Sequence, residues 1–247
     1  RQLIEANRMV THLSQVMAQD NMHLASLADQ LQDDIGGMRL VPFDSIVGGL
    51  QRMVRDIARD TEKQLSLNVI GTAVEIDKSV LDSLKEPLMH LLRNSVDHGI
   101  EIASERARAG KPPTGHIEIE VEQRGSEIKI YISDDGKGID ADKVRRSIVK
   151  NNLLSELDAA ALSDEEARSY IFYSGLSTSS KVTTLSGRGL GMDIVRDRVE
   201  GLRGRVSAQS IVGESTKITV SVPVSLTRIR CVLLRAGDQK FAIPSAM

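Results

Sequence analysis

The sequence predicts an α/β sandwich, a mostly antiparallel sheet with helices on one face. Four short runs alternate apolar with polar residues, as half-buried strands do: 117–123, 127–133, 205–210 and 216–222. Two longer runs carry apolar residues at helical spacing, as amphipathic helices do: 44–62 and 78–98. Strand pairs that alternate with such helices are typical of a two-layer domain, in which one apolar sheet face packs against the helices.

The composition fits a globular protein that does not bind nucleic acid. The 247 residues are 40% hydrophobic and carry a net charge of -2, so no basic face for a polyanion is indicated. Aromatic residues make up only 2%, which argues against base-stacking platforms. No apolar run approaches the ~20 residues that span a bilayer. The one cysteine, Cys231, permits no internal disulfide and suits a reducing cytosol.

Residues 1–40 predict a helical segment that associates with a partner. Apolar residues follow steps of three and four, which is a heptad seam: Leu3, Ala6, Val10, Leu13, Met17, Leu24, Leu27, Leu31 and Met38. Asp20 occupies one seam position, so either the helix breaks near 19–21 or a polar residue interrupts the seam. We favour self-association over packing on the chain's own domain, because so narrow a seam suits partner helices.

The elements that follow can be placed in order. Gly36-Gly37 and Pro42 mark a boundary, and Pro42 suits the first turn of the helix over 44–62. Before the first hairpin we expect a strand over 65–70, the helix over 78–98 and a charged loop over 101–115. After it we expect short helices over 141–173, a mobile loop over 174–186, a helix over 192–200, the second hairpin and a third hairpin over 230–235 and 239–243.

The most informative stretch is SGRGLGMDI over 186–194, in which Gly187, Gly189 and Gly191 alternate ahead of a helix-like run. Without a Cβ, alternating glycines let backbone N–H groups turn toward an anion. A helix N-terminus directly behind them adds the positive end of its dipole. The pattern predicts a phosphate cradle, whereas glycines alone usually make simple turns.

A second box, SDDGKGI over 133–139, follows a predicted strand. An acidic residue at a strand end can accept a hydrogen bond from an exocyclic amine, and Gly136 and Gly138 would let a flat ring lie against the backbone. The alternative is an ordinary Asp-Gly turn.

A third box lies in the predicted helix over 78–98 and just beyond it. His90, Asn94, Asp97 and Glu101 recur at helical spacing, so on a continuous helix they would share one face. The amide oxygen of Asn94 suits a hard cation such as Mg²⁺. The alternative is a solvated polar face.

In this order the three boxes resemble the ATP site of the histidine kinase, gyrase and Hsp90 superfamily. From about Leu27 onward the chain is similar to the CheA-type chemotaxis histidine kinases, in the segments MRLVPFDSIVGGLQRMVRDIA, PLMHLLRNSVDHGIE, SDDGKGID and SGRGLGMDIV. The resemblance implies the two-layer α/β (α+β) sandwich of that superfamily. It divides the chain into a dimerisation helix or helical hairpin over 1–40, an ATP-binding kinase domain over 41–224 and the start of a CheW-like, SH3-like regulatory β domain over 225–247.

The resemblance also implies roles for individual residues. Asp134 is assigned to the adenine amine as the first residue of the DxGxG pattern, with Asp135 as the alternative. Asn94 and His90 are assigned to Mg²⁺, although an imidazole nitrogen is an unusual magnesium ligand. The other residues assigned to the nucleotide are Asp97, Gly136, Gly138, Arg146, Ser186, Gly187, Arg188, Gly189, Leu190 and Gly191. Catalysis is assigned to His90, Asn94, His98 and Lys181, and the cations Arg146, Lys181 and Arg188 either neutralise the transferred phosphoryl group or are solvated surface residues.

The phosphate acceptor is expected outside these residues. None of the five histidines lies in an acceptor context, since no His-Glu pair opens a helix. In the family the acceptor histidine belongs to a separate phosphotransfer domain. The resemblance therefore implies a homodimeric kinase with ATP and Mg²⁺ as cofactors, which phosphorylates that domain for relay to a response regulator. It also implies a CheW-like adaptor and chemoreceptors as partners, in a cytoplasmic protein that is recruited to membrane receptor arrays without inserting into the membrane.

Two observations keep an alternative open, namely an ATP-gated dimeric scaffold or ATPase of the same superfamily without kinase activity. Leu176 stands where the family usually has Phe, and Ser179 where some relatives carry Lys, so lid closure is expected to be weaker. An ATPase would need a base that acts on water, and the acid nearest its usual place is Glu86. Glu86 lies two turns before Asn94, which is too far along the helix to fit well.

Overall fold

The computed structural model describes residues 39–174, 191–225, 231–237 and 239–244, together with Met17 and Asp20. The chain divides into two compact units, Arg1–Leu40 and Val41–Met247. In the first unit Met17 and Asp20 are helical and exposed, and the rest of the predicted seam lies outside the described residues. Association through that seam and the three-part division of the chain stay predictions.

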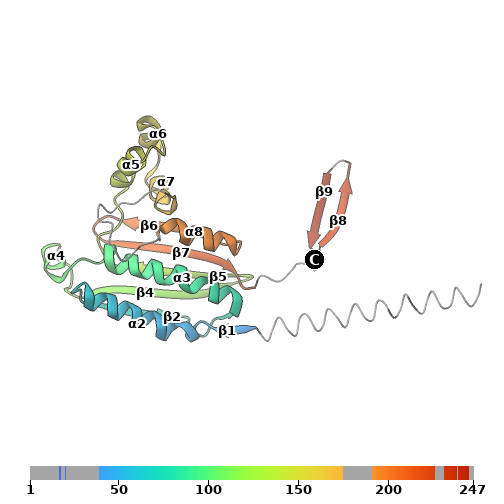
Figure 1. Ribbon diagram of the computed structural model, residues 1–247, viewed down its shortest axis with the longest axis horizontal. Helices are drawn as coiled ribbons and strands as arrows, with labels where there is room; N and C mark the ends of the chain where they lie inside the picture. The colour runs from blue at the N-terminus through green and yellow to red at the C-terminus, as the bar shows by residue number, and fades with distance from the viewer. Residues whose placement is uncertain are drawn as a thin grey trace, which may run out of the picture. The chain divides into compact units, whose positions relative to one another are not determined.

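The second unit contains a five-stranded sheet (Figure 1) in the order β2 (Leu65–Ile70), β4 (Gly115–Arg124), β5 (Glu127–Asp134), β7 (Ser215–Pro223) and β6 (Arg205–Ile211). β2 runs parallel to β4, and the other neighbouring strands are antiparallel. The prediction of a mostly antiparallel sheet built from two hairpins is confirmed.

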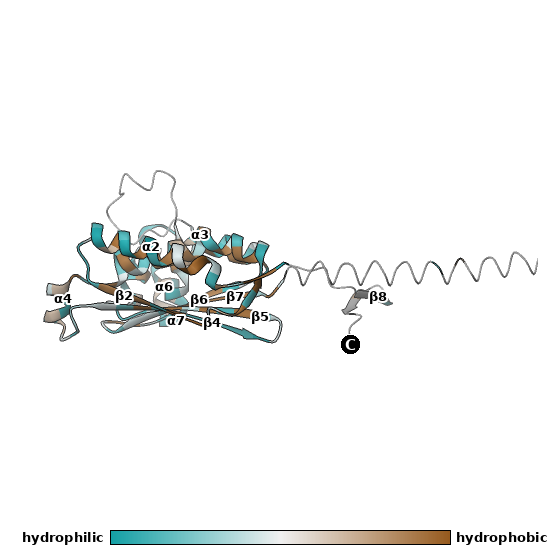
Figure 2. Cartoon of the chain, turned by 90° about the horizontal axis from the view of Figure 1, so that it is seen from below, coloured by the Kyte–Doolittle hydropathy of each residue, from teal (hydrophilic) through white to brown (hydrophobic). Residues whose placement is uncertain are grey.

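One face of the sheet is covered by α2 (Asp44–Asp60), α3 (Lys78–Asn94) and α8 (Met192–Gly201). Figure 2 shows α2 and α3 side by side on one side of the strands. Along β5 the residues Ile128, Ile130 and Ile132 are at most 1% exposed, whereas the residues between them are half-buried. This period of two places the apolar side chains in one core with the helices and leaves the polar ones on the other face.

The helix predicted over 78–98 forms, but it changes its winding at Asn94. Asp77 is the N-cap of α3, and its carboxylate accepts a hydrogen bond from the backbone N–H of Ser79 at 2.8 Å. After Asn94 the chain continues as a π-helical turn, η1 (Ser95–Gly99), and then becomes extended at Ile100. The expectation that Glu101 shares a helix face with His90 and Asn94 is therefore wrong, because the helix ends two residues before Glu101.

The sequence analysis did not predict two short strands near the start of this unit. Pro42 ends β1 (Leu40–Pro42), which pairs with β3 (Glu75–Asp77), so its placement in the first turn of α2 is wrong. The reason is local: the next residue, Phe43, is fully buried and donates its backbone N–H to Val74 O at 2.9 Å, which ties this connection to the segment ahead of β3. Three-residue strands carry too few alternations to be read from sequence.

Most of the remaining predictions along the chain are confirmed in outline, whereas the mobile loop predicted over 174–186 lies almost entirely outside the described residues and stays a prediction. The charged loop contains α4 (Ala103–Arg108), and the short helices are α5 (Ala141–Lys150), α6 (Glu156–Ala161), α7 (Asp164–Ser169) and the 3₁₀ turn η2 (Tyr170–Phe172). The third hairpin is β8 (Cys231–Ala236) with β9 (Gln239–Pro244). Its membership of an SH3-like domain stays a prediction. Within the described ranges no helix combines the length and the apolar character that a membrane crossing requires.

Candidate functional site

Asp134 is the buried acid of the second box. It is the last residue of β5, and the strand alternation that buries the isoleucines before it also turns its side chain inward, leaving it 6% exposed. Its carboxylate accepts hydrogen bonds from the Ser95 hydroxyl at 2.8 Å and from the backbone N–H of Gly136 at 3.2 Å. Burial raises the pKa of Asp134 to about 6. It forms no ion pair with any cation in the described part of the chain.

Asp135, the alternative, is already engaged. Its carboxylate forms an ion pair with Arg106 at 2.7 Å and accepts the backbone N–H of His116 at 2.8 Å. A carboxylate offers about four acceptor positions, of which Asp134 uses two within the protein. Asp134 is thus better suited than Asp135 to accept a hydrogen bond from a ligand amine, and the adenine assignment remains a prediction.

The two glycines of this box are required by the protein's own packing. A Cβ on Gly136 would lie 2.2 Å from the carbonyl oxygen of Gly99. Gly138 has a φ of +71°, and a Cβ there would lie 2.4 Å from the carbonyl oxygen of Ile211. The sequence interpretation attributed both glycines to space for a flat ring. The structure supplies a second reason, the close approach of η1 and β6 to this turn.

Asn94 lies where α3 meets the start of α8. Its side-chain N–H₂ donates to the Met192 sulfur at 2.9 Å, so the amide oxygen is the atom available to a cation. Gly191 is the N-cap of α8 and makes no side-chain cap. In the first turn the backbone N–H of Ile194 donates to the Asp193 carboxylate at 3.0 Å, so a ligand could use only the N–H groups ahead of it. The third box and the end of the glycine box are therefore neighbours in space.

Two histidines of the third box are held in the neutral form. Burial, and then the charge of Arg93, lowers the pKa of His90. Burial is also the main cause of the lowered pKa of His98, although this residue as a whole is exposed. A neutral imidazole can bind a metal or take up a proton at pH 7. In the described ranges no three His, Cys, Asp or Glu side chains converge as metal ligands, so a Mg²⁺ ion here would depend on Asn94 together with the nucleotide phosphates.

Three cations that the sequence did not single out contact these boxes. Lys63 donates to the carbonyl oxygens of Val96 at 2.6 Å and Asp97 at 2.8 Å, and so holds the π turn that carries Asp97 and His98. Arg106 and Lys111 contact the turn after Asp134. All three lie in charged stretches whose sequence predicts solvent-exposed side chains. No periodic pattern in these stretches distinguishes them from surface residues.

Other predicted residues are placed differently or lie outside the description. Arg146 is exposed on α5. Glu86 is exposed on α3, and its nearest charged partner is Arg198 at 3.6 Å, so it is not in the position of a base that acts on water. Outside the described residues lie the lid and cradle positions Leu176, Ser179, Lys181, Ser186, Gly187, Arg188, Gly189 and Leu190.

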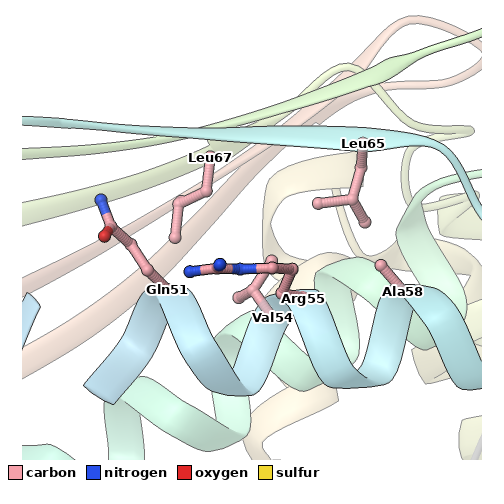
Figure 3. Close-up of a pocket in the computed structure, with 6 residues that line it drawn as sticks. All are labelled: Gln51, Val54, Arg55, Ala58, Leu65 and Leu67. Carbon is pink, nitrogen blue, oxygen red and sulfur yellow. The ribbon is translucent and has the colours of Figure 1, made fainter. Parts of the chain in front are cut away.

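A cavity of about 220 Å³ lies elsewhere, between α2 and β2. Figure 3 shows Leu65 and Leu67 of β2 facing the helix, and the other lining residues are Gln51, Val54, Arg55 and Ala58. None of the predicted site residues lines this cavity, so the candidate site is the region around Asn94 and Asp134.

Comparison with known proteins places this fold and site in one class. Residues 80–226 match the family described as histidine kinase-, DNA gyrase B-, and HSP90-like ATPase, and the chain belongs to that family. Within it, the resemblance to CheA-type kinases is confirmed. The chain is 39% identical over 221 residues to the chemotaxis protein CheA of Halobacterium salinarum, covering 90% of this chain and 33% of that protein.

Two further relatives show the same extent of similarity. The gliding motility regulatory protein of Myxococcus xanthus is 39% identical over 224 residues, which cover 91% of this chain and 28% of that protein. The sensor histidine kinase CheAY of Helicobacter pylori is 35% identical over 240 residues, which cover 97% of this chain and 29% of that protein. The chain thus spans about a third of the length of the curated relatives that it matches.

Proposed function

We propose that this chain is the nucleotide-binding core of a histidine kinase of the CheA type. It binds ATP with Mg²⁺, and the γ-phosphoryl group passes to a histidine of a separate phosphotransfer domain, for relay to a response regulator in chemotaxis-type signalling. Membership of the ATPase family and the similarity to CheA proteins support the class. The observation that carries the proposal for this site is the buried carboxylate of Asp134, which forms no ion pair with a cation among the described residues.

The chemistry of Asp134 suits an adenine amine. Its pKa of about 6 leaves the carboxylate ionised at neutral pH, and the described residues use only two of its about four acceptor positions. A charged acceptor that is shielded from water binds an N–H donor more strongly than an exposed one does. Ser95 and the backbone of Gly136 fix the direction in which this carboxylate points.

The phosphate end of the nucleotide fits the other half of the site. Asn94 would offer its amide oxygen to Mg²⁺, with His90 as a further ligand, and the positive end of the α8 dipole would attract the phosphates. The glycine box that ends at Gly191 would surround them, with Lys181 and Arg188 as cations that neutralise the transferred group. When bound, ATP supplies the phosphoryl group, and the protein's part is to position it and balance its charge.

The partners proposed from the similarity are a second copy of this chain, the phosphotransfer domain, a response regulator, a CheW-like adaptor and chemoreceptors. With such partners the protein would work in the cytoplasm at membrane receptor arrays. The heptad seam over 1–40 supports the homodimer, and the other partners rest on the similarity to chemotaxis proteins.

Incubation with γ-labelled ATP and Mg²⁺ tests the proposal. The chain alone is expected to bind ATP but to stay unlabelled, because none of its histidines lies in an acceptor context. Addition of a histidine phosphotransfer domain of the chemotaxis kinase class should give acid-labile, alkali-stable label on that domain. Alkali-stable label on the isolated chain, or none on any supplied domain although ATP binds, would contradict the proposal.

A further inference from the structure

The loop between η1 and β4 is built around a buried arginine. Arg106 lies on α4, and its side chain is 0% exposed. Its guanidinium group forms ion pairs with Glu101 at 3.2 Å and Asp135 at 2.7 Å. It also donates to the backbone carbonyl oxygens of Pro112 at 2.7 Å and Asp135 at 3.2 Å. A buried charge is tolerated only when its donors are satisfied, so the surrounding loop takes its shape from Arg106.

A second cation of this loop contacts the same turn. The Lys111 ammonium group donates to the Glu101 carboxylate at 3.0 Å, to the carbonyl oxygen of Asp135 at 2.9 Å and to that of Gly136 at 2.7 Å. Its side chain is 15% exposed. Arg106 and Lys111 together therefore bind two consecutive carbonyl groups directly after Asp134.

The opposite side of the turn rests on η1. The carbonyl oxygen of Gly99 accepts the backbone N–H of Lys137 at 3.0 Å, and the same oxygen leaves no room for a Cβ on Gly136. The turn is thus held between η1 and the two cations. Because the N–H of Gly136 donates to the Asp134 carboxylate, any shift of this turn also moves one of the two hydrogen bonds that orient Asp134.

Charge adds to this geometric argument. After burial, the charges of Asp135 and Glu101 are further causes of the raised pKa of Asp134. Arg106 and Lys111 pair with those same two carboxylates. Two cations and two carboxylates balance, and Asp134 is left as the one carboxylate of this cluster that is not paired with a cation within the described ranges.

We propose that Arg106 and Lys111 are positioning residues for the nucleotide site, which fix the turn over 135–137 so that the Asp134 carboxylate points toward the amine of adenine. The inference rests on the proposed function, because it assumes that Asp134 recognises adenine. It predicts that these cations affect recognition of the 6-amino group and leave binding of the sugar and phosphates unchanged.

The test compares ATP with purine riboside triphosphate, which lacks the 6-amino group, by calorimetry. The unchanged chain should bind ATP ~10- to 100-fold more tightly than the analogue. Lys111→Met should lower this ratio by about threefold or more, with analogue affinity within about twofold of the unchanged chain. Lys111→Arg should restore most of the ratio. Arg108→Met is the matched control, because Arg108 is an exposed cation three residues before Lys111, at the end of α4, and it should leave the ratio unchanged.

The outcomes are separable from those of the proposed function. A ratio near one in the unchanged chain would refute adenine recognition itself, and the positioning role with it. If the unchanged chain prefers ATP over the analogue by the expected ratio and a folded Lys111→Met variant keeps that ratio, the positioning role alone is overturned. An equal loss of affinity for ATP and for the analogue in this variant would overturn it too. Arg106→Met leaves two carboxylates facing each other in the loop and is expected to fold poorly, so the more exposed Lys111 decides the question.

Discussion

Replacing Asp134 by Asn is expected to weaken ATP binding while stabilising the protein. The carboxylate is 6% exposed and has a pKa of about 6 against an ordinary value of 3.8. A difference of about two pH units corresponds to ~3 kcal/mol, which is the approximate free energy that burial of the charged form removes from folding. Asn has no charge to bury, and the Ser95 hydroxyl can accept from its N–H₂ as readily as it donates to Asp134.

The sign of the pH dependence follows from the raised pKa. Well below pH 3.8, Asp134 is protonated in both folded and unfolded chains and no penalty exists. The penalty develops as the pH rises from 3.8 toward 6 and is complete above that range. The stabilising effect of Asp134→Asn on the free energy of unfolding should therefore be small at pH 4 and largest above pH 7.

Affinity should change in the opposite direction. The loss of a hydrogen bond to a charged acceptor costs ~1.5–3 kcal/mol, which is about a ten- to hundredfold loss of ATP affinity. Asp135→Asn provides the contrast. This variant keeps an acceptor for the His116 N–H but loses the charge opposite the buried Arg106. Because Asp135 itself is 39% exposed, the loss should lower stability by only ~1 kcal/mol. It should lower ATP affinity by less than about threefold.

Calorimetric titration with ATP at pH 7.5, and urea unfolding at pH 4 and pH 7.5, measure both effects on both variants. Equal losses of ATP affinity in the two variants, or a larger loss for Asp135→Asn, would show that the assignment of the adenine contact to Asp134 is wrong. An unchanged or lower stability of Asp134→Asn at pH 7.5 would refute the argument from burial.

Three further changes test other parts of the structure. Asn94→Ala should reduce transfer to a phosphotransfer domain to below about a tenth of wild type while sparing much of the nucleotide affinity, because it removes a metal ligand and not an adenine contact; transfer above that level would exclude Asn94 as the magnesium ligand. Gly136→Ala should lower the melting temperature, since the new Cβ would lie 2.2 Å from a backbone oxygen and force a shift that costs ~1–3 kcal/mol. Leu27→Asp combined with Leu31→Asp should convert a dimer to a monomer with intact ATP binding, as measured by sedimentation, and a monomeric unchanged chain at tens of micromolar would disprove the seam.

The fold could be predicted from local patterns because its long elements are strongly periodic. The strand alternation of residues 127–133 and the helical apolar spacing of 44–62 each record one buried face, and the structure places both faces in one core. The same alternation, continued one residue further, is what buries Asp134. The sequence contained that information, but the choice between Asp134 and Asp135 required knowing where β5 ends.

The surroundings of the site could not be predicted in this way. Arg106 and Lys111 stand in a charged stretch whose pattern is that of a solvated loop, and only the chain's return past β5 buries them against Asp135 and Gly136. Ser95, in the π turn after Asn94, contacts Asp134, which is distant in the sequence. Met192, at the N-terminus of α8, contacts Asn94 across a still longer separation.

Local sequence patterns were enough to predict the sheet, the main helices and the family, because each is recorded in neighbouring residues. Tertiary structure decided which carboxylate is buried without a cation and which cations hold its turn. The physical reason is that burial and charge pairing depend on groups brought together from far apart along the chain: Ser95 and Asp134 are 39 positions apart, and Asn94 and Met192 are 98.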